Sequence, residues 1–169
     1  MKKHFLSVVV ILVGVISITS INYAQMLSHG SWGISAVVNG AQADILFPIW
    51  TGNLNTIAPS IGVANIGGVN TDIAAGLVYH HYIAYTSNFA PIIGFRAGAI
   101  FGIPKVGTST TDWIAGLLGG GEYFFSKNFS MGIEAQLNFD FSAKLSNRFG
   151  NPGGVNYNTG TVLFATVYF

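Results

Sequence analysis

The sequence predicts an all-β protein, an eight-stranded antiparallel up-and-down β-barrel that spans a membrane. The segment 129–145, FSMGIEAQLNFDFSAKL, alternates apolar residues at odd positions with small or polar residues at even positions. Half of the 169 residues are hydrophobic and only 8% are charged, against roughly a quarter in ordinary soluble domains. The chain also has 22 glycines and 14% aromatic residues, a composition that fits tight turns and aromatic belts at two membrane surfaces.

The alternation over 129–145 predicts one long strand with an apolar face and a polar face, because successive side chains of a strand point to opposite sides. A strand in a soluble protein has about five or six residues, whereas about 9 to 11 residues cross a bilayer at a tilt. The 17 residues of this segment therefore predict a strand that crosses a membrane and extends beyond it.

Residues 1–24 are predicted to be a secretory signal peptide, removed from a barrel domain over 25–169. Two lysines near the start precede an apolar run, 5–18, which small and polar residues follow. The run is shorter than the about 20 apolar residues that a transmembrane helix needs. Cleavage after Ala24 is favoured, cleavage after Ser20 is an alternative, and an uncleaved helical anchor is a second alternative.

Alternation and turn residues place eight strands along the rest of the chain. They cover residues 31–39, 43–50, 56–65, 71–85, 89–103, 112–125, 129–145 and 157–169. The first three are the least regular, and Pro48 and Pro59 interrupt the pattern because proline cannot donate to a sheet ladder. The expected turns at 86–88 and 126–128 are short and the connections 104–111 and 146–156 are long. This alternation is typical of outer-membrane barrels, with the short turns on the periplasmic side.

The inward and outward sets are clearest in the later strands. In 89–103, Phe89, Phe95 and the other odd-numbered apolar residues are expected to face outward, and Arg96 inward. In 112–125, Glu122 falls on the inward set. A further group of aromatic residues is expected to contact lipid or form the belts at the membrane surfaces: Trp32, Trp113, Tyr123, Phe129 and Phe169.

The chain ends on an alternating segment, GTVLFATVYF, whose last residue is Phe169. An aromatic C-terminus on such a strand resembles the signal by which the barrel-assembly machinery recognises its substrates. Phe169 is therefore the predicted assembly signal, and that machinery is an expected partner. The alternative is an edge strand of a soluble protein, which would invite aggregation.

Two segments resemble a known family. GGGEYFFSKNFSMGIEAQLNFDF (119–141) and IAPSIGVA (57–64) resemble the small outer-membrane β-barrel proteins related to OmpX and to the OmpA transmembrane domain, above all those of Bacteroidota-type bacteria. The resemblance covers essentially all of 25–169, and the hairpin with the SKN turn is its most specific part. It implies an eight-stranded barrel in the cell outer membrane with an interior filled by side chains. OmpA-like proteins often carry a peptidoglycan-binding domain after the barrel; because the sequence ends at Phe169, we expect no such tether.

Ionisable residues on the inward set are predicted to form one cluster. An eight-stranded interior is just wide enough for side chains to fill, and buried charges must pair. The short turns predict that Glu134 lies opposite Gly120 with Glu122 one diagonal step away, and that His80 lies diagonal to Arg96. If Arg96 also lies opposite Gly120, the cluster comprises His80, Arg96, Glu122 and Glu134. Two carboxylates near one guanidinium favour a bidentate ion pair.

The favoured function is a structural or loop-mediated interaction protein with this cluster as a plug of the packed interior. We expect a monomer in contact with outer-membrane lipids and lipopolysaccharide. The best candidate for meeting an extracellular partner is the connection 146–156, which carries Arg148. The first alternative is a small, porin-like channel of low conductance that the Arg96 cluster gates.

The second alternative, a lipid A-modifying enzyme, has only His29 and Ser31 as a His-x-Ser pair, and we expect no enzymatic activity. We also expect no cofactor and no metal site. The chain has no cysteine, and His80 and His81 would point to opposite faces of one strand, so they cannot share a metal ion. A net charge of +1 without a basic run does not favour nucleic acid. A secreted lipocalin-type barrel remains a weaker option.

Overall fold

The computed structural model describes residues 31–39, 42–66, 70–83 and 88–169. The strands are β1 (Gly33–Asn39), β2 (Gln42–Leu46), β3 (Ile49–Trp50), β4 (Asn55–Ile66), β5 (Asn70–Tyr82), β6 (Phe89–Pro104), β7 (Thr110–Ser126), β8 (Phe129–Phe141) and β9 (Val155–Tyr168). No helix among the described residues is long and apolar enough to cross a membrane. The predicted signal peptide, residues 1–24, lies outside the described residues.

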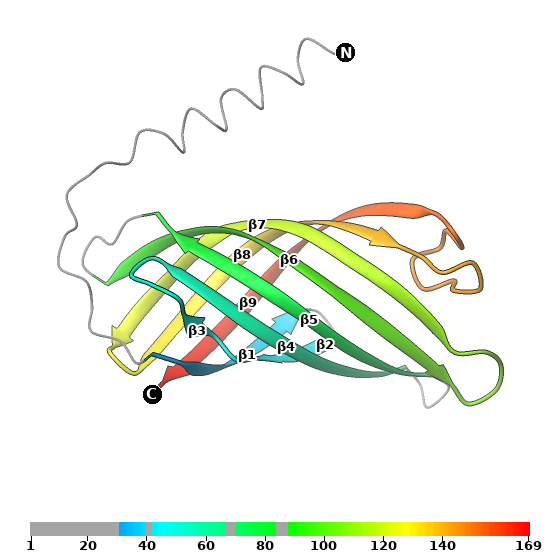
Figure 1. The fold of residues 1–169 in the computed structure, drawn as a ribbon, viewed down its shortest axis with the longest axis horizontal. Coiled ribbons are helices and arrows are strands. Elements are labelled where there is room, and N and C mark those ends of the chain that lie inside the picture. Colours follow the sequence, from blue (N-terminus) through cyan, green and yellow to red (C-terminus); the bar gives the residue numbers. More distant parts are fainter. Residues whose placement is uncertain (1–30, 40–41, 67–69, 84–87) are drawn as a thin grey trace, which may run out of the picture.

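The strands form one antiparallel sheet that closes on itself (Figure 1). Its order is β2-β1-β9-β8-β7-β6-β5-β4-β3, and the additional pairing of β2 with β4 completes the circle. β2 and β3 are two parts of one strand that is interrupted at Pro48. The backbone N–H of Phe47 still donates to the carbonyl of Pro59 at 2.9 Å, and that of Gly33 to the carbonyl of Pro48 at 2.8 Å. Counting β2 and β3 together, the wall has eight strands, and the predicted fold class is confirmed.

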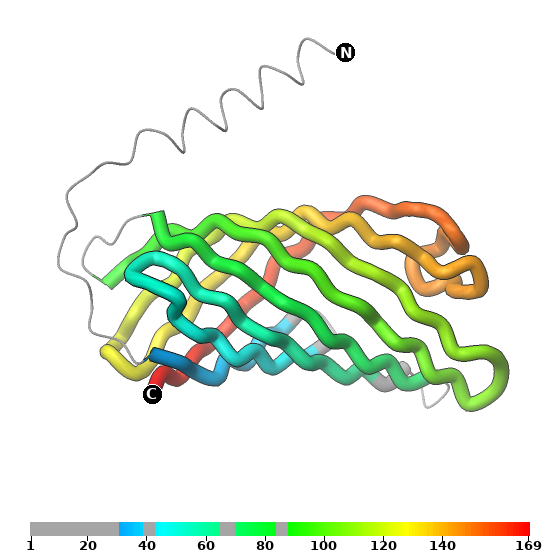
Figure 2. Tube along the Cα trace, viewed as in Figure 1, coloured from blue at the N-terminus to red at the C-terminus, as the bar shows by residue number. Residues whose placement is uncertain are grey.

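The barrel has two different ends. At the terminal end, β1 begins and β9 ends, and a two-residue turn, Lys127-Asn128, joins β7 to β8. At the loop end, the longer connections 105–109 and 142–154 join β6 to β7 and β8 to β9 (Figure 2). Short and long connections therefore alternate as predicted over the last four strands. The expected turn at 86–88 falls mostly outside the described residues.

One strand boundary was predicted wrongly in a way that matters for the loop end. The alternation suggested a strand over 129–145, but β8 ends at Phe141. The N–H of Ser142 donates within the following connection, to the carbonyl of Gly154 at 2.9 Å, and the N–H of Ala143 donates to an Asp112 carboxylate oxygen at 2.8 Å. Leu145 lies in the connection and is 76% exposed. The predicted strand 71–85 also ends earlier, at Tyr82.

The ladder is not equally long around the barrel. β6 and β7 share 14 residue pairs and β8 and β9 share 13. β1 and β9 share only six pairs, and β2 and β4 only four. The barrel wall is therefore shorter along the axis where the β1–β2 hairpin forms it. In Figure 1 this hairpin ends well short of the loop end.

The alternation separates an apolar exterior from a mixed interior. The five aromatic residues predicted for the belts are all exposed. At the terminal end the rings of Trp32 and Phe169 stack at 4.7 Å between centroids. At the loop end, the rings of Phe139 and Tyr157 meet edge to face at 5.6 Å. Many large buried side chains, mostly aromatic, lie in the terminal half, and several buried polar ones lie toward the loop end. The first group includes Tyr82, Ile92, Phe124, Phe164 and Tyr168, and the second includes Asp72, Asp112, Asn138 and Asp140.

Candidate functional site

The register of β7 and β8 turns two glutamates into the barrel. Glu134 lies opposite Gly120, and Glu122 lies opposite Gly132, one diagonal step from Glu134. Both carboxylates are almost completely buried, with 4% of Glu134 and 1% of Glu122 exposed. A Cβ atom on Gly120 would lie 2.0 Å from the carbonyl oxygen of Ile133. The close approach of the two strands at this pair therefore requires glycine.

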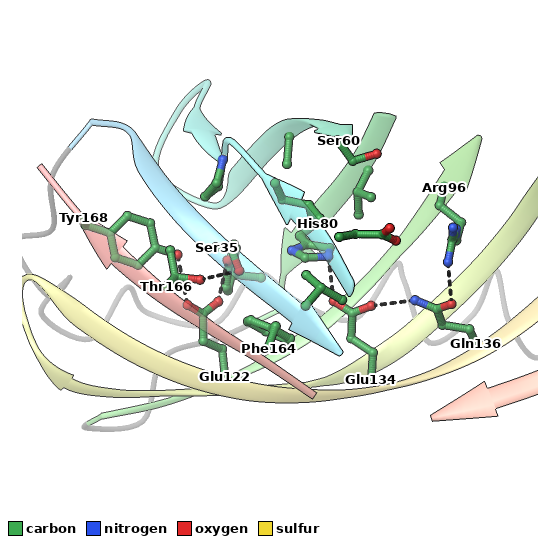
Figure 3. A pocket seen from close by; sticks show the side chains of 17 residues that line it. Ser35, Ser60, His80, Arg96, Glu122, Glu134, Gln136, Phe164, Thr166 and Tyr168 are labelled. Carbon is green, nitrogen blue, oxygen red and sulfur yellow. Dashed lines mark hydrogen bonds and ion pairs between the residues drawn. The ribbon is translucent and has the colours of Figure 1, made fainter. Parts of the chain in front are cut away.

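A hydrogen-bonded chain crosses the middle of the interior (Figure 3). Nε2 of His80 lies 2.9 Å from Oε1 of Glu134. The amide nitrogen of Gln136 donates to the other Glu134 oxygen at 3.1 Å, and its amide oxygen accepts from Nη1 of Arg96 at 2.8 Å. Gln136 therefore joins the histidine–glutamate pair to the guanidinium, since one amide group both donates and accepts.

Arg96 does not lie where the prediction placed it. It pairs with Gly116, not with Gly120, four residues further along β7. The expected diagonal relation to His80 is present, since His80 pairs with Gly94 and Val78 with Arg96. At its actual position Arg96 donates to Gln136 in place of a carboxylate. The structure gives Arg96 a hydrogen bond to Gln136 in place of the predicted bidentate ion pair with a glutamate. The sequence argument did not identify Gln136.

Glu122 belongs to a separate cluster at the terminal end. Its carboxylate accepts hydrogen bonds from Tyr82 at 2.7 Å, from Tyr168 at 2.9 Å and from the hydroxyl of Ser130. Three hydroxyl donors thus surround one carboxylate. The four residues of the predicted cluster fall into two groups: His80, Arg96 and Glu134 in one chain, and Glu122 with its hydroxyl partners in the other.

The described interior leaves little free space. A cavity of about 40 Å³ lies beside the polar chain and includes His80, Arg96 and Glu134 in its lining. A second, of about 30 Å³, lies beyond Arg96 toward the loop end. Volumes of this size hold a few water molecules at most. Side chains of the described residues therefore occupy most of the interior.

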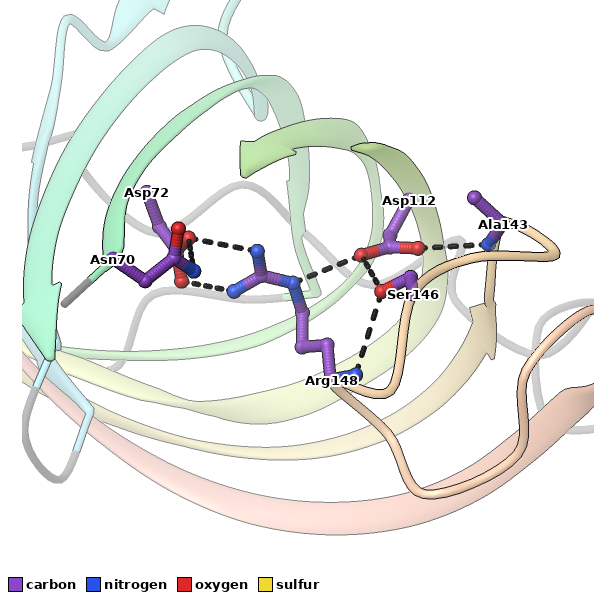
Figure 4. Close-up of polar contacts among 6 residues, drawn as sticks. All are labelled: Asn70, Asp72, Asp112, Ala143, Ser146 and Arg148. Atoms are coloured by element: carbon purple, nitrogen blue, oxygen red, sulfur yellow. Dashed lines mark hydrogen bonds and ion pairs between the residues drawn. The ribbon is translucent and has the colours of Figure 1, made fainter. Parts of the chain in front are cut away.

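A second ionic cluster, which sequence reasoning did not find, lies at the loop end (Figure 4). The guanidinium of Arg148 donates through both terminal nitrogens to Asp72, with Nη2 2.8 Å from Oδ1, and through Nε to Asp112 at 2.9 Å. The hydroxyl of Ser146 donates to the same Asp112 oxygen at 2.7 Å. Hydrogen bonding to Asp72 is the main cause that raises the pKa of Arg148 above its ordinary value. Asp72 and Asp112 do fall on the inward sets, but Arg148 is 76 residues from Asp72, so no local pattern joins them.

The histidines considered for catalysis or metal binding lie apart. His29 is outside the described residues, and Ser31 is an exposed residue whose carbonyl accepts from the N–H of Trp50 at 2.9 Å. Nδ1 of His81 lies 2.8 Å from the side-chain oxygen of Asn55. His80 and His81 are neighbours on β5 and point to opposite faces of the wall, since His80 is buried inside the barrel and His81 is not.

We expect the His80–Glu134 pair to be energetically coupled. Glu134→Leu should lower the free energy of unfolding by about 3 kcal/mol, because it leaves the buried partners of a carboxylate unsatisfied. The double variant His80→Phe with Glu134→Leu should lose less than the sum of the two single variants. Urea unfolding in detergent micelles, followed by tryptophan fluorescence, measures the difference. Additive losses would contradict the coupling.

Comparisons with known proteins support the fold. No protein-family model matches the sequence, and no curated protein sequence matches it. Among solved structures, the barrel is similar to Neisserial surface protein A, with a TM-score of 0.57 and 14% identity over 82% of this chain and 93% of that one. It is also similar to the N-terminal β-barrel domain of Pseudomonas aeruginosa OprF, with a TM-score of 0.56 and 14% identity over 86% of this chain and all of that domain.

The outer wall determines where such a barrel resides. Large apolar side chains are exposed on strands all around the described barrel, from Ile34 on β1 to Val167 on β9. A continuous apolar exterior of this kind marks a surface that meets lipid, and a closed barrel is the form in which a sheet can span lipid, because it leaves no free edge. The fold and this exterior together identify a small barrel of the cell outer membrane.

Proposed function

We propose that the chain is a closed, monomeric outer-membrane barrel, related to the OmpX and OmpA-type barrels, that acts as a structural or loop-mediated interaction protein. One observation carries this proposal: among the described residues, side chains occupy most of the interior, and the two cavities that lie beside the polar chain measure about 40 and 30 Å³. A hydrated ion needs a continuous aqueous path, and cavities that hold a few water molecules at most do not supply one by themselves. The carboxylates inside are engaged by His80, Gln136 and hydroxyl groups, as a stable plug requires.

The loop end supports the interaction role. Val106, at the tip of the β6–β7 connection, is 91% exposed, and Leu145 on the β8–β9 connection is 76% exposed. Loops that a rigid scaffold presents often carry binding residues, and these two side chains are accessible for such a contact. Lys105 and Lys144 lie beside them and are also exposed. A partner that meets this end would therefore find apolar tips flanked by positive charge.

Conductance tests the proposal against its first alternative, a porin-like channel gated by Arg96. We expect the refolded barrel to show no discrete currents in a planar bilayer, and we expect Arg96→Ala to be equally silent, because large side chains still fill the terminal half. A heat-dependent shift on a gel confirms that each sample is folded before it is measured. Discrete currents in the wild-type barrel that change in Arg96→Ala would overturn the proposal in favour of the channel.

A lipid measurement addresses the remaining alternative, a lipid A-modifying enzyme. We propose that expression leaves the mass spectrum of lipid A unchanged, because the described histidines His80 and His81 contact Glu134 and Asn55 through their ring nitrogens. An altered lipid A that Ser31→Ala abolishes would support the enzyme.

A further inference from the structure

The connection 142–154 is folded as an ordered strap. The N–H of Gly153 donates to the carbonyl of Ala143 at 3.1 Å, and the side-chain amide of Asn156 donates to the carbonyl of Phe149. Gly150 and Gly153 have φ values of +72° and +73°, a left-handed conformation that glycine adopts without strain. These turns bring the middle of the strap back toward the barrel axis, as Figure 4 shows for Arg148.

Three neighbouring strands form a cradle for the Arg148 side chain. Asp72 on β5 lies opposite Gly102 on β6, and Asp112 follows two residues after the β7 partner of Gly102. A Cβ atom on Gly102 would lie 2.9 Å from Nη2 of Arg148. The glycine thus leaves the space in which the guanidinium lies between the two carboxylates.

Charge makes this contact specific. Asp72 is 4% exposed and Asp112 is fully buried, so both carboxylates need compensation in place. Arg148 supplies it through three N–H groups, two to Asp72 and one to Asp112. This planar fork is a geometry that a guanidinium offers and an ammonium does not.

We propose that Asp72, Gly102 and Asp112 form a guanidinium-binding site, and that Arg148 occupies it to latch the strap 142–154 over the loop end of the barrel. Through Arg148, the latch connects Asp72 on β5 with Asp112 on β7, on either side of β6. It holds the strap at Arg148, in the middle of 142–154. When the guanidinium leaves, the cradle becomes an acidic recess open to a guanidinium group from solution. This inference stands on the loop-end geometry and does not depend on the proposed function.

The chain offers a clean reporter for the latch. It contains no cysteine, so a single introduced thiol is unique. Ser142, at the base of the strap, is 9% exposed and its hydroxyl has no hydrogen-bond partner. Ser142→Cys therefore changes little in the folded barrel. A water-soluble maleimide should modify this thiol slowly while the strap is latched.

The test compares variants in the Ser142→Cys background. Arg148→Ala should accelerate modification by about tenfold or more, because a locally opened segment exposes its buried groups. Lys144→Ala removes an exposed cation from the same strap and should leave the rate unchanged. Arg148→Lys should remain fast, since one ammonium cannot bridge both carboxylates. A heat-dependent gel shift verifies that every barrel is folded.

Chemical rescue identifies the site itself. Millimolar methylguanidinium should restore protection in Arg148→Ala, and methylammonium at the same concentration should not. Unchanged labelling in Arg148→Ala would overturn the latch. Three results would overturn the guanidinium site. The thiol could be fully protected in Arg148→Lys, the two cations could restore protection equally in Arg148→Ala, or neither cation could restore it. If Arg148→Ala does not fold, Asp112→Asn provides the second variant. It should label faster than Lys144→Ala, and an equal rate would contradict the latch.

Discussion

Gly120→Ala should prevent normal closure of the barrel or lower its free energy of unfolding by at least about 3 kcal/mol. The added Cβ would lie 2.0 Å from the carbonyl oxygen of Ile133 and 2.9 Å from the Cα of Glu134. Both are backbone atoms of the paired strand β8, which cannot move aside as the end of a flexible side chain can. Relief of the clash would separate β7 from β8 and break the ladder beside Glu134.

The neighbouring glycine provides a matched control. A Cβ on Gly119 would meet its nearest atom, the carbonyl oxygen of Ile92, at 3.9 Å, which is ordinary contact. Gly119→Ala should therefore change the free energy of unfolding by no more than about 0.5 kcal/mol. Urea unfolding in detergent micelles and the heat-dependent gel shift compare the two variants. Equal stability of Gly120→Ala and Gly119→Ala would show that the close approach of the strands does not limit folding.

Glu122→Leu should be the most harmful change among the buried polar residues. The carboxylate accepts hydrogen bonds from three buried hydroxyl groups, those of Tyr82, Ser130 and Tyr168. Its loss removes the acceptor that these three donors share, at about 1 to 3 kcal/mol for each hydrogen bond, so we expect a loss of about 4 kcal/mol. Glu122→Gln keeps one acceptor oxygen and should lose less.

A combined variant separates the effect of the lost hydrogen bonds from the effect of the lost side-chain packing. Glu122→Leu together with Tyr82→Phe and Tyr168→Phe removes two donors along with their acceptor. It should be more stable than Glu122→Leu alone, because replacing donors together with their acceptor by apolar groups of similar shape costs little. The urea midpoint of each refolded variant measures this. A combined variant less stable than Glu122→Leu alone would contradict the account.

The sequence predicted the structure well wherever a tight turn set the register. Counting along the chain from the predicted turn 126–128 gave the pairing of Gly120 with Glu134, and the structure has this pairing. The actual turn is one residue shorter, and a register shift between Phe124 and Ser126 makes up the difference. The inward position of Glu122 followed from the same period of two. These predictions needed only the alternation and a short connection.

The errors arose where a longer connection intervenes. The loop 105–109 allows several registers between β6 and β7, and Arg96 pairs four residues away from the expected partner. The alternation over 129–145 runs past the end of β8, because strap residues such as Leu145 happen to continue it. The Arg148 latch depends on the strap conformation and on three strands at once, which no local period encodes.

The unequal length of the strand ladders affects where the barrel wall opens locally. Six residue pairs hold β1 to β9, and six hold the divided strand β2 and β3 to β4, against 14 between β6 and β7. Local opening begins where the fewest interactions must be broken. We therefore expect local opening at this side first, and the β5–β8 side to stay paired. The most easily opened part of the molecule is thus expected to lie in the barrel wall, where β1 pairs with β9 and β2 with β4, and not in the packed interior.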